Sequence, residues 1–142
     1  MISISHAEWF VMRIIWTLRK ASSHQIIHVL SQNKGWKPST TKTLITRLRK
    51  KRYIQAHRVK NRFVYTALIG EQQSANIVAL NLFKNICPMH AGRAINSLFQ
   101  HITISKSDVS QLIKTLKRIE PKAPKRVKCN CLSTKKDRTC KN

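Results

Sequence analysis

Three of the four cysteines lie close together near the C-terminus. Cys129 and Cys131 form a C-x-C pair, and Cys140 follows them. Thiolates are soft ligands that favour Cu(I) and Zn(II). The lysines around them favour the thiolate because they stabilise negative charge. These residues therefore predict a metal site, with spectator thiols as the alternative. The fourth cysteine, Cys87, lies on the apolar face of an expected helix and is interpreted as core packing.

A second chemical feature is the basic stretch from Trp36 to Tyr53. Pro38 suits the first position of a helix, which we expect to run to about Lys51. One side of this helix is largely aliphatic: Thr41, Leu44, Ile45 and Leu48. The other side carries hydroxyl and cationic groups that can contact phosphates and base edges: Ser39, Lys42, Thr43, Thr46, Arg47 and Lys50. This pattern suits a helix that enters the major groove of DNA, and a solvated basic helix is the alternative.

The overall charge points to a polyanionic partner. The 142 residues include 28 Lys or Arg and 5 Asp or Glu, which gives a net charge of +23. The excess is concentrated in residues 1–70 and 121–142. No apolar run approaches the roughly 20 residues of a membrane span, and the N-terminus lacks the pattern of a signal peptide. We therefore expect a cytoplasmic protein with reduced cysteines and no membrane partner.

The region before the basic helix predicts two helices. Ser5 and Glu8 form a capping box that opens a helix ending near Leu18, and Ser22 with Gln25 forms another. Gly35 suits a left-handed C-cap for the second helix. The apolar residues of the first helix fall on two neighbouring stripes, and we interpret the aromatic ones as core: Trp9, Met12 and Trp16 on one stripe, and Val11, Ile15 and Leu18 on the next.

The region after the basic helix predicts a β-hairpin. Ile54 and Ala56 alternate with polar residues, as do Phe63, Tyr65 and Ala67, with a turn at Lys60-Asn61. The tip carries three cations: Arg58, Lys60 and Arg62. Three helices followed by a basic hairpin predict a winged helix-turn-helix, in which the third helix enters the groove and the wing follows the DNA backbone.

The second half predicts three more helices, over 71–87, 88–101 and 105–119. The last has an apolar seam near a heptad pattern, which we interpret as a dimer interface: Leu112, Ile113, Leu116 and Ile119. An intramolecular subdomain is the alternative. Pro121 and Pro124 then end the helix, and the lysine-rich tail is expected to be disordered without a ligand.

The predicted fold class is therefore mainly α, with three parts. Residues 1–70 form a winged helix-turn-helix DNA-binding domain, residues 71–120 a helical dimerisation domain, and residues 121–142 a basic, cysteine-containing metal-sensing tail. An enzyme is not expected, because the chain has three glycines in all and offers no phosphate-cradling motif, carboxylate pair or Cys/His constellation in an ordered region.

Three blocks of sequence resemble the penicillinase-repressor family of winged-helix regulators: HAEWFVMRIIW, WKPSTTKTLITRLRKKRYI and RFVYTALI. The WKPSTTKTL block and the cysteine tail are similar to the CopY-type, copper-responsive branch of that family. The resemblance implies a homodimer on an inverted-repeat operator of copper-transport genes. It also implies Zn(II) in the DNA-bound form, Cu(I) as the inducer, and a copper chaperone as a partner that delivers Cu(I).

The family motif has two C-x-C pairs separated by four residues, and this chain departs from it. Cys129 and Cys131 match the first pair, but only Cys140 is available for the second, and position 142 is Asn. Structural zinc favours four ligands, whereas Cu(I) accepts two or three thiolates. Two other functions stay open: a β-lactam-resistance repressor released by proteolysis, and a general RNA- or ribosome-binding basic protein.

Overall fold

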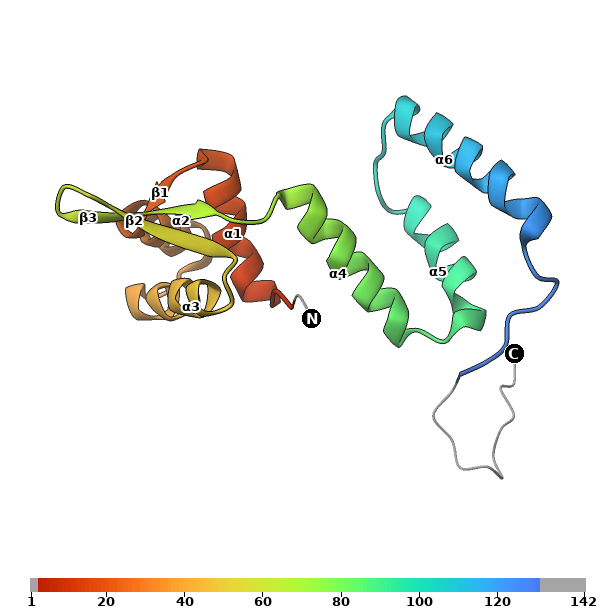
Figure 1. Ribbon diagram of the computed structural model, residues 1–142, viewed down its shortest axis with the longest axis horizontal. Coiled ribbons are helices and arrows are strands. Elements are labelled where there is room, and N and C mark those ends of the chain that lie inside the picture. Colours follow the sequence, from red (N-terminus) through yellow and green to blue (C-terminus); the bar gives the residue numbers. More distant parts are fainter. Residues whose placement is uncertain (1–2, 131–142) are drawn as a thin grey trace, which may run out of the picture. The chain divides into compact units, whose positions relative to one another are not determined.

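The computed structural model describes residues 3–130 (Figure 1). The chain divides into two compact units, Met1–Leu80 and Asn81–Asn142. Of the helices within the described residues, none is both long enough and apolar enough to cross a lipid bilayer.

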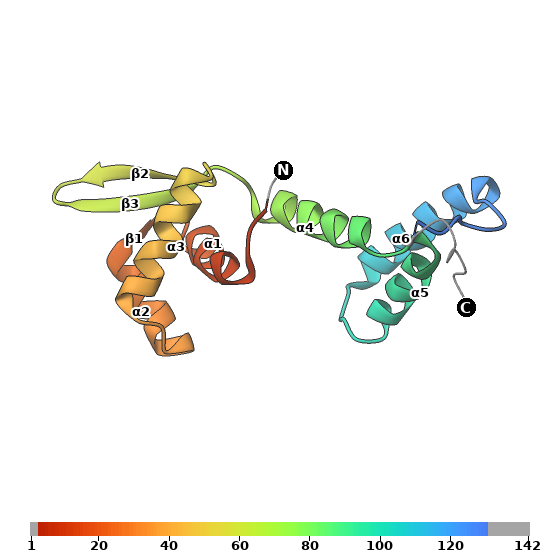
Figure 2. The same ribbon diagram turned by 90° about the horizontal axis from the view of Figure 1, so that it is seen from below.

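The first unit is a winged helix. Its elements are α1 (His6–Leu18), β1 (Ala21–Ser22), α2 (Ser23–Lys34), α3 (Pro38–Lys50), β2 (Ile54–Val59) and β3 (Arg62–Ala67). The strands form one antiparallel sheet in the order β1-β3-β2. Figure 2 shows the long β2–β3 hairpin extending beyond the three helices. The predicted fold class is confirmed.

The helix ends follow the expected local chemistry. The Ser5 hydroxyl accepts from the Glu8 backbone N–H at 3.2 Å, and the Glu8 carboxylate accepts from the Ser5 N–H at 2.8 Å. Ser22 and Gln25 form the same reciprocal pair at the start of α2. Gly35 ends α2 with φ of 66°, a conformation that glycine adopts without a Cβ clash. Both capping boxes and the C-cap are confirmed.

The core of the first unit lies between the three helices and the sheet. Its fully buried side chains include Met12, Ile15, Ile26 and Leu48. Leu18 ends α1, as predicted, and its side chain remains 43% exposed. Trp16 is half-buried, and its indole Nε1 donates to the Ile69 carbonyl at 2.8 Å. This bond ties α1 to the segment that follows the hairpin.

Strand β1 was not predicted. It has two residues, which is too short to produce an alternating pattern. Ala21 pairs with Tyr65 and Ser22 pairs with Val64. Only the pairing with β3, set by the folded chain, makes this segment a strand.

The second unit is helical and thinly packed. Helix α4 (Glu71–Asn85) spans the boundary between the units, and α5 (Pro88–Phe99), α6 (Lys106–Ile119) and the 3-10 turn η1 (Glu120–Lys122) follow. The predicted end of the last helix at Ile119 is confirmed. No residue in the described range 81–130 is buried. A single copy of this unit therefore has no closed hydrophobic core of its own.

Candidate nucleic-acid interface

Helix α3 has a buried back and an exposed front. Its buried residues are Thr41, Leu44, Ile45 and Leu48. All six residues predicted to contact DNA from this helix are exposed: Ser39, Lys42, Thr43, Thr46, Arg47 and Lys50. The amphipathic pattern fixes which side faces the core, so the cations and hydroxyls must face outward. The sequence-predicted front is thus one continuous polar surface.

The hydroxyls on this front are already engaged within the helix. Thr43 Oγ1 donates to the Ser39 carbonyl at 3.0 Å, and Thr46 Oγ1 donates to the Lys42 carbonyl at 3.0 Å. A phosphate oxygen is an acceptor, so either hydroxyl must rotate its proton away from the helix to bind one. Lys37, the N-cap of α3, makes no side-chain capping bond. Pro38 has no backbone N–H, and the Thr40 N–H donates to the Lys37 carbonyl at 3.0 Å. At this helix start, the Ser39 backbone N–H can therefore take part in binding an anion.

The hairpin places cations on its tip. Arg58, Lys60 and Arg62 are exposed, and Lys60 occupies the turn with a positive φ of 55°. Phe63 pairs with Arg58 across the strands and is 52% exposed. In the sequence, the alternating pattern predicted Phe63 only as a strand residue. The basic charge around it was the only signal that it lies beyond the core.

An ion pair between a partly exposed lysine and a buried carboxylate joins the end of α3 to the start of α1. Lys51 Nζ lies 2.7 Å from Glu8 Oε2, and it also donates to the Ser3 carbonyl at 2.9 Å. Burial alone raises the pKa of the Glu8 carboxyl. Hydrogen bonds from Lys51 and Ser5 and the Lys51 charge outweigh burial, so the pKa lies below its ordinary value. Glu8 is thus a fixed anion that holds the end of the exposed basic helix.

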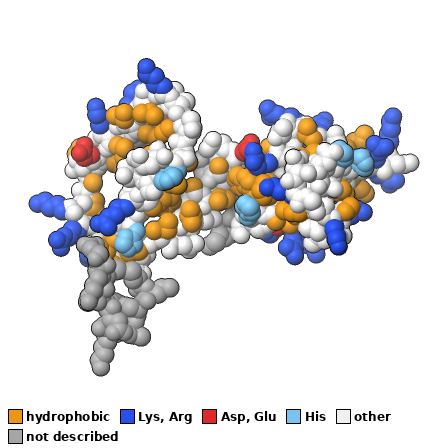
Figure 3. All heavy atoms as spheres, turned by 180° about the vertical axis from the view of Figure 1, so that it is seen from behind, with side chains coloured by type: hydrophobic (Ala, Val, Ile, Leu, Met, Phe, Trp, Pro, Cys, Tyr) orange, Lys and Arg blue, Asp and Glu red, His pale blue; other side chains and the backbone are white. Residues whose placement is uncertain are grey.

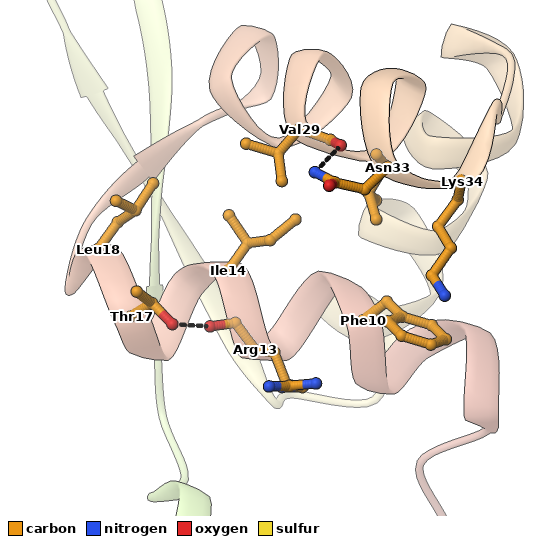
Figure 4. Close-up of a pocket in the computed structure, with 9 residues that line it drawn as sticks. Phe10, Arg13, Ile14, Thr17, Leu18, Val29, Asn33 and Lys34 are labelled. Atoms are coloured by element: carbon orange, nitrogen blue, oxygen red, sulfur yellow. Dashed lines mark hydrogen bonds between the residues drawn. The ribbon is translucent and has the colours of Figure 1, made fainter.

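A groove between α1 and α2 lies outside this surface. It has a volume of about 540 Å³, and none of the residues that line it come from α3 or the hairpin. Figure 4 shows apolar side chains on its floor, with Arg13 and Lys34 at the rim. Lys34 Nζ lies 4.1 Å from the centre of the Phe10 ring. The residues that line it carry no carboxylate, thiol or imidazole.

The cysteines require two corrections. Cys87 is not in a core: it is the half-buried N-cap residue of α5, and its thiol lies against Cys129, with 3.7 Å between the sulfurs. The apolar residues around it suggested burial, but the preceding helix ends before it and turns it toward the tail. Cys129 is disulfide-bonded in the structure, so the reduced state predicted from compartment alone does not hold there.

The remaining predicted metal ligands, Cys131 and Cys140, lie outside the described residues. Within residues 3–130, no three His, Cys, Asp or Glu side chains are grouped closely enough to hold a metal ion. Of the three predicted metal ligands, Cys129 is therefore the one that lies within the described residues.

The predicted dimer seam lies along α6. Ile113, Leu116 and Ile119 are exposed, and Leu112 is half-buried. Two apolar grooves run beside these residues, with volumes of about 340 and 430 Å³. Figure 3 shows hydrophobic side chains at the surface of this unit, interleaved with cations.

Comparison with known proteins places the chain in a family. Residues 4–118 match the penicillinase repressor family. An uncharacterized 16.5 kDa protein from Latilactobacillus sakei is 37% identical, over 94% of this chain and 92% of its own length. The methicillin resistance regulatory protein MecI of Staphylococcus aureus is also 37% identical, over 76% of this chain and 84% of its own length.

Among solved structures, one similar chain is the monomeric form of Bacillus licheniformis BlaI in complex with the blaP half-operator. Its sequence is 36% identical, with a TM-score of 0.46, and the match covers 51% of this chain and 88% of that one. The match over residues 4–118 spans both units described above. The chain therefore belongs to the penicillinase repressor family of DNA-binding transcriptional repressors.

Proposed function

We propose that this chain is a copper-responsive transcriptional repressor that binds an inverted-repeat operator as a homodimer and is released by Cu(I). The observation that carries the DNA-binding part is the two-sided α3. Its aliphatic back is buried in the first unit, and its cationic front is exposed beside a basic hairpin. Such a surface can place Arg47 against base edges while lysines neutralise phosphates.

The absence of a buried residue in the described part of the second unit supports dimerisation. Leu116 is 53% exposed, and burying about 80 Å² of such a side chain contributes roughly 2 kcal/mol at 25 cal/mol per Å². Exposed apolar side chains are also present at Ile95, Leu98, Ile102 and Ile113. Pairing two copies through α5 and α6 covers these surfaces, and an inverted-repeat operator matches the two-fold symmetry of such a dimer.

The thiols support metal sensing. Cys129 and Cys131 retain the C-x-C spacing of the copper-responsive branch, and the tail between Lys122 and Lys128 carries cations but no acidic residue. Soft thiolates favour Cu(I) over the hard cations of the cell. Zn(II) is the proposed metal of the DNA-bound form, and a copper chaperone is the proposed source of Cu(I).

A second candidate is a repressor of the β-lactam-resistance type, released by proteolysis. The 37% identity to a methicillin resistance regulatory protein favours it. The two candidates share the DNA-binding surface and differ in the signal. If Cu(I) releases the operator while the chain stays intact on a denaturing gel, the copper-responsive function is supported. If the operator is released only when the chain is cleaved, the β-lactam-resistance function is supported.

The DNA-binding part is tested by selection from a random duplex library at physiological salt, with a random RNA library as the control. We expect enrichment of a dyad-symmetric duplex whose half-sites are about 10 base pairs apart or a multiple of that spacing. Equal retention of RNA, or a selected duplex without dyad symmetry, would show a general basic nucleic-acid binder instead.

A further inference from the structure

The basic end of the hairpin carries an exposed aromatic side chain. Phe63 is 52% exposed, and it is not among the residues that pack against the hydrophobic core of the first unit. Within residues 3–130, its ring makes no stacking contact with another aromatic ring and no cation–π contact of the kind that joins Lys34 to Phe10. Packing within the described chain therefore does not account for a large apolar side chain at this position.

The strand register decides on which side of the hairpin this ring lies. Phe63 pairs with Arg58, and Tyr65 lies two residues further along β3. Paired residues share a side of the sheet, as do residues two apart on one strand. Tyr65 is 6% exposed and belongs to the core, so Phe63 and Arg58 lie on the core-facing side, beyond the point where the core ends. Val59 is also 52% exposed, but it pairs with Arg62 on the opposite side.

The core-facing side of the hairpin is also the side on which α3 presents its front. The core lies between the sheet and the helices, and the buried back of α3 belongs to that core. A duplex bound to the front of α3 therefore lies on the same side of the sheet as Phe63. Figure 2 shows that the hairpin extends past the helices, so its end is free to reach such a duplex.

An aromatic ring beside an arginine suits the minor groove of DNA. Arginine is attracted into narrow minor grooves, where the negative potential is enhanced. Proteins that enter this groove frequently place apolar side chains there, phenylalanine among them. Contacts with the phosphates use cations and hydrogen-bond donors, so a hairpin that only followed the backbone would have no use for an exposed ring.

We propose that Phe63 is a DNA-contacting residue whose ring enters the minor groove beside a half-site and packs against the deoxyriboses, next to Arg58. This inference rests on the proposed operator binding and deepens it, because it gives the hairpin an apolar contact that salt does not screen. The contact also favours DNA over RNA, since the minor groove of an RNA helix is wide, shallow and lined by 2′-hydroxyl groups.

The test uses the full-length protein and the dyad-symmetric duplex selected from the random library. Phe63→Ala removes the ring. Val59→Ala is the matched control, because it removes an equally exposed apolar side chain from the opposite side of the same hairpin. Anisotropy titrations at several salt concentrations give the affinity and its salt dependence. Hydroxyl-radical footprinting reports which deoxyriboses the protein covers in the minor groove.

We expect Phe63→Ala to weaken binding about tenfold for each hairpin that engages the duplex, because about 60 Å² of apolar surface is no longer buried. Its slope of log affinity against log salt should equal the native slope, since no charge is removed, whereas Arg58→Gln should reduce the slope. The native protein and Val59→Ala should protect the deoxyriboses beside each half-site, and Phe63→Ala should not. Phe63→Leu keeps an apolar side chain and should recover most of the affinity.

Urea unfolding should show that Phe63→Ala is as stable as Val59→Ala. Equal operator affinities of these two variants, or unchanged deoxyribose protection in Phe63→Ala, would overturn the inference while the proposed function stands. Loss of the dimer by Phe63→Ala in sedimentation would also overturn it, because the ring would then contact a second copy of the chain. If the native protein selects no dyad-symmetric duplex, the proposed function fails, and the same footprints on the best-bound duplex still decide the role of Phe63.

Discussion

Replacing Lys51 by Met tests how the end of α3 is held. The native Lys51 ammonium lies 2.7 Å from Glu8, whose side chain is 2% exposed. Removing the cation leaves a buried carboxylate with only its Ser5 hydrogen bonds. Breaking a fully buried pair typically costs about 3–5 kcal/mol. Because the Lys51 side chain is 38% exposed, solvent screens it, and we expect a loss of about 2 kcal/mol.

The effect should depend on pH in a defined direction. The pKa of Glu8 lies below its ordinary value of 4.5 in the folded protein. Its contribution is therefore fully present above the unfolded pKa and is lost as pH falls through the folded pKa. Once Glu8 is protonated, Lys51 has no anion to stabilise. The stability difference between the native protein and Lys51→Met should therefore shrink toward zero at acidic pH.

Urea unfolding followed by tryptophan fluorescence measures this difference. All three tryptophans, Trp9, Trp16 and Trp36, lie in the first unit, so the signal reports that unit alone. Lys50→Met is the matched control, because it removes the neighbouring cation and leaves the ion pair. Equal stabilities of Lys50→Met and Lys51→Met at pH 7, or a difference that persists unchanged in acid, would refute the anchoring role.

Three further predictions concern the interface, the dimer and the core. Arg47→Ala should lower the ratio of specific to non-specific DNA affinity in anisotropy titrations. Lys60→Ala should weaken both affinities and reduce the slope of log affinity against log salt by about 0.9. An unchanged affinity ratio for Arg47→Ala would show that α3 does not recognise bases. Leu116→Glu should give monomers in sedimentation, because an unpaired buried charge costs several kcal/mol. The control Lys114→Glu should stay dimeric. An intact Leu116→Glu dimer would show that this seam is not the dimer interface. Thr41 Oγ1 is buried with no hydrogen-bond partner among the described residues. Thr41→Val should therefore be neutral or raise the free energy of unfolding by about 1 kcal/mol in urea titrations. A large loss of stability would show that the hydroxyl has a partner.

Local chemistry made the first unit predictable. Capping at Ser5 and Ser22, the glycine at position 35 and Pro38 each act over a few residues, so the sequence alone places the helix ends. The front of α3 followed from helical spacing for the same reason. Once the aliphatic residues are assigned to the buried face, the remaining residues of α3 form the exposed face.

Contacts between distant residues could not be predicted in this way. The Glu8–Lys51 pair and the β1–β3 pairing depend on how α1 and the hairpin pack around the core. The sequence showed Glu8 only as a capping residue, because its second partner lies 43 positions away. Cys87 was misread for the same reason: its apolar neighbours are local, and the Cys129 sulfur is not.

The measurement that most directly tests the account is operator affinity of the reduced protein with and without Cu(I), under anaerobic conditions. The native protein should lose affinity as Cu(I) is added, because a ligand shifts an equilibrium only through different affinities for two states. Cys129→Ser combined with Cys131→Ser should bind the metal-free operator nearly as well as the native protein and should not respond to Cu(I). Release of the double variant by Cu(I), or a native protein that stays on the operator, would contradict copper sensing by the tail.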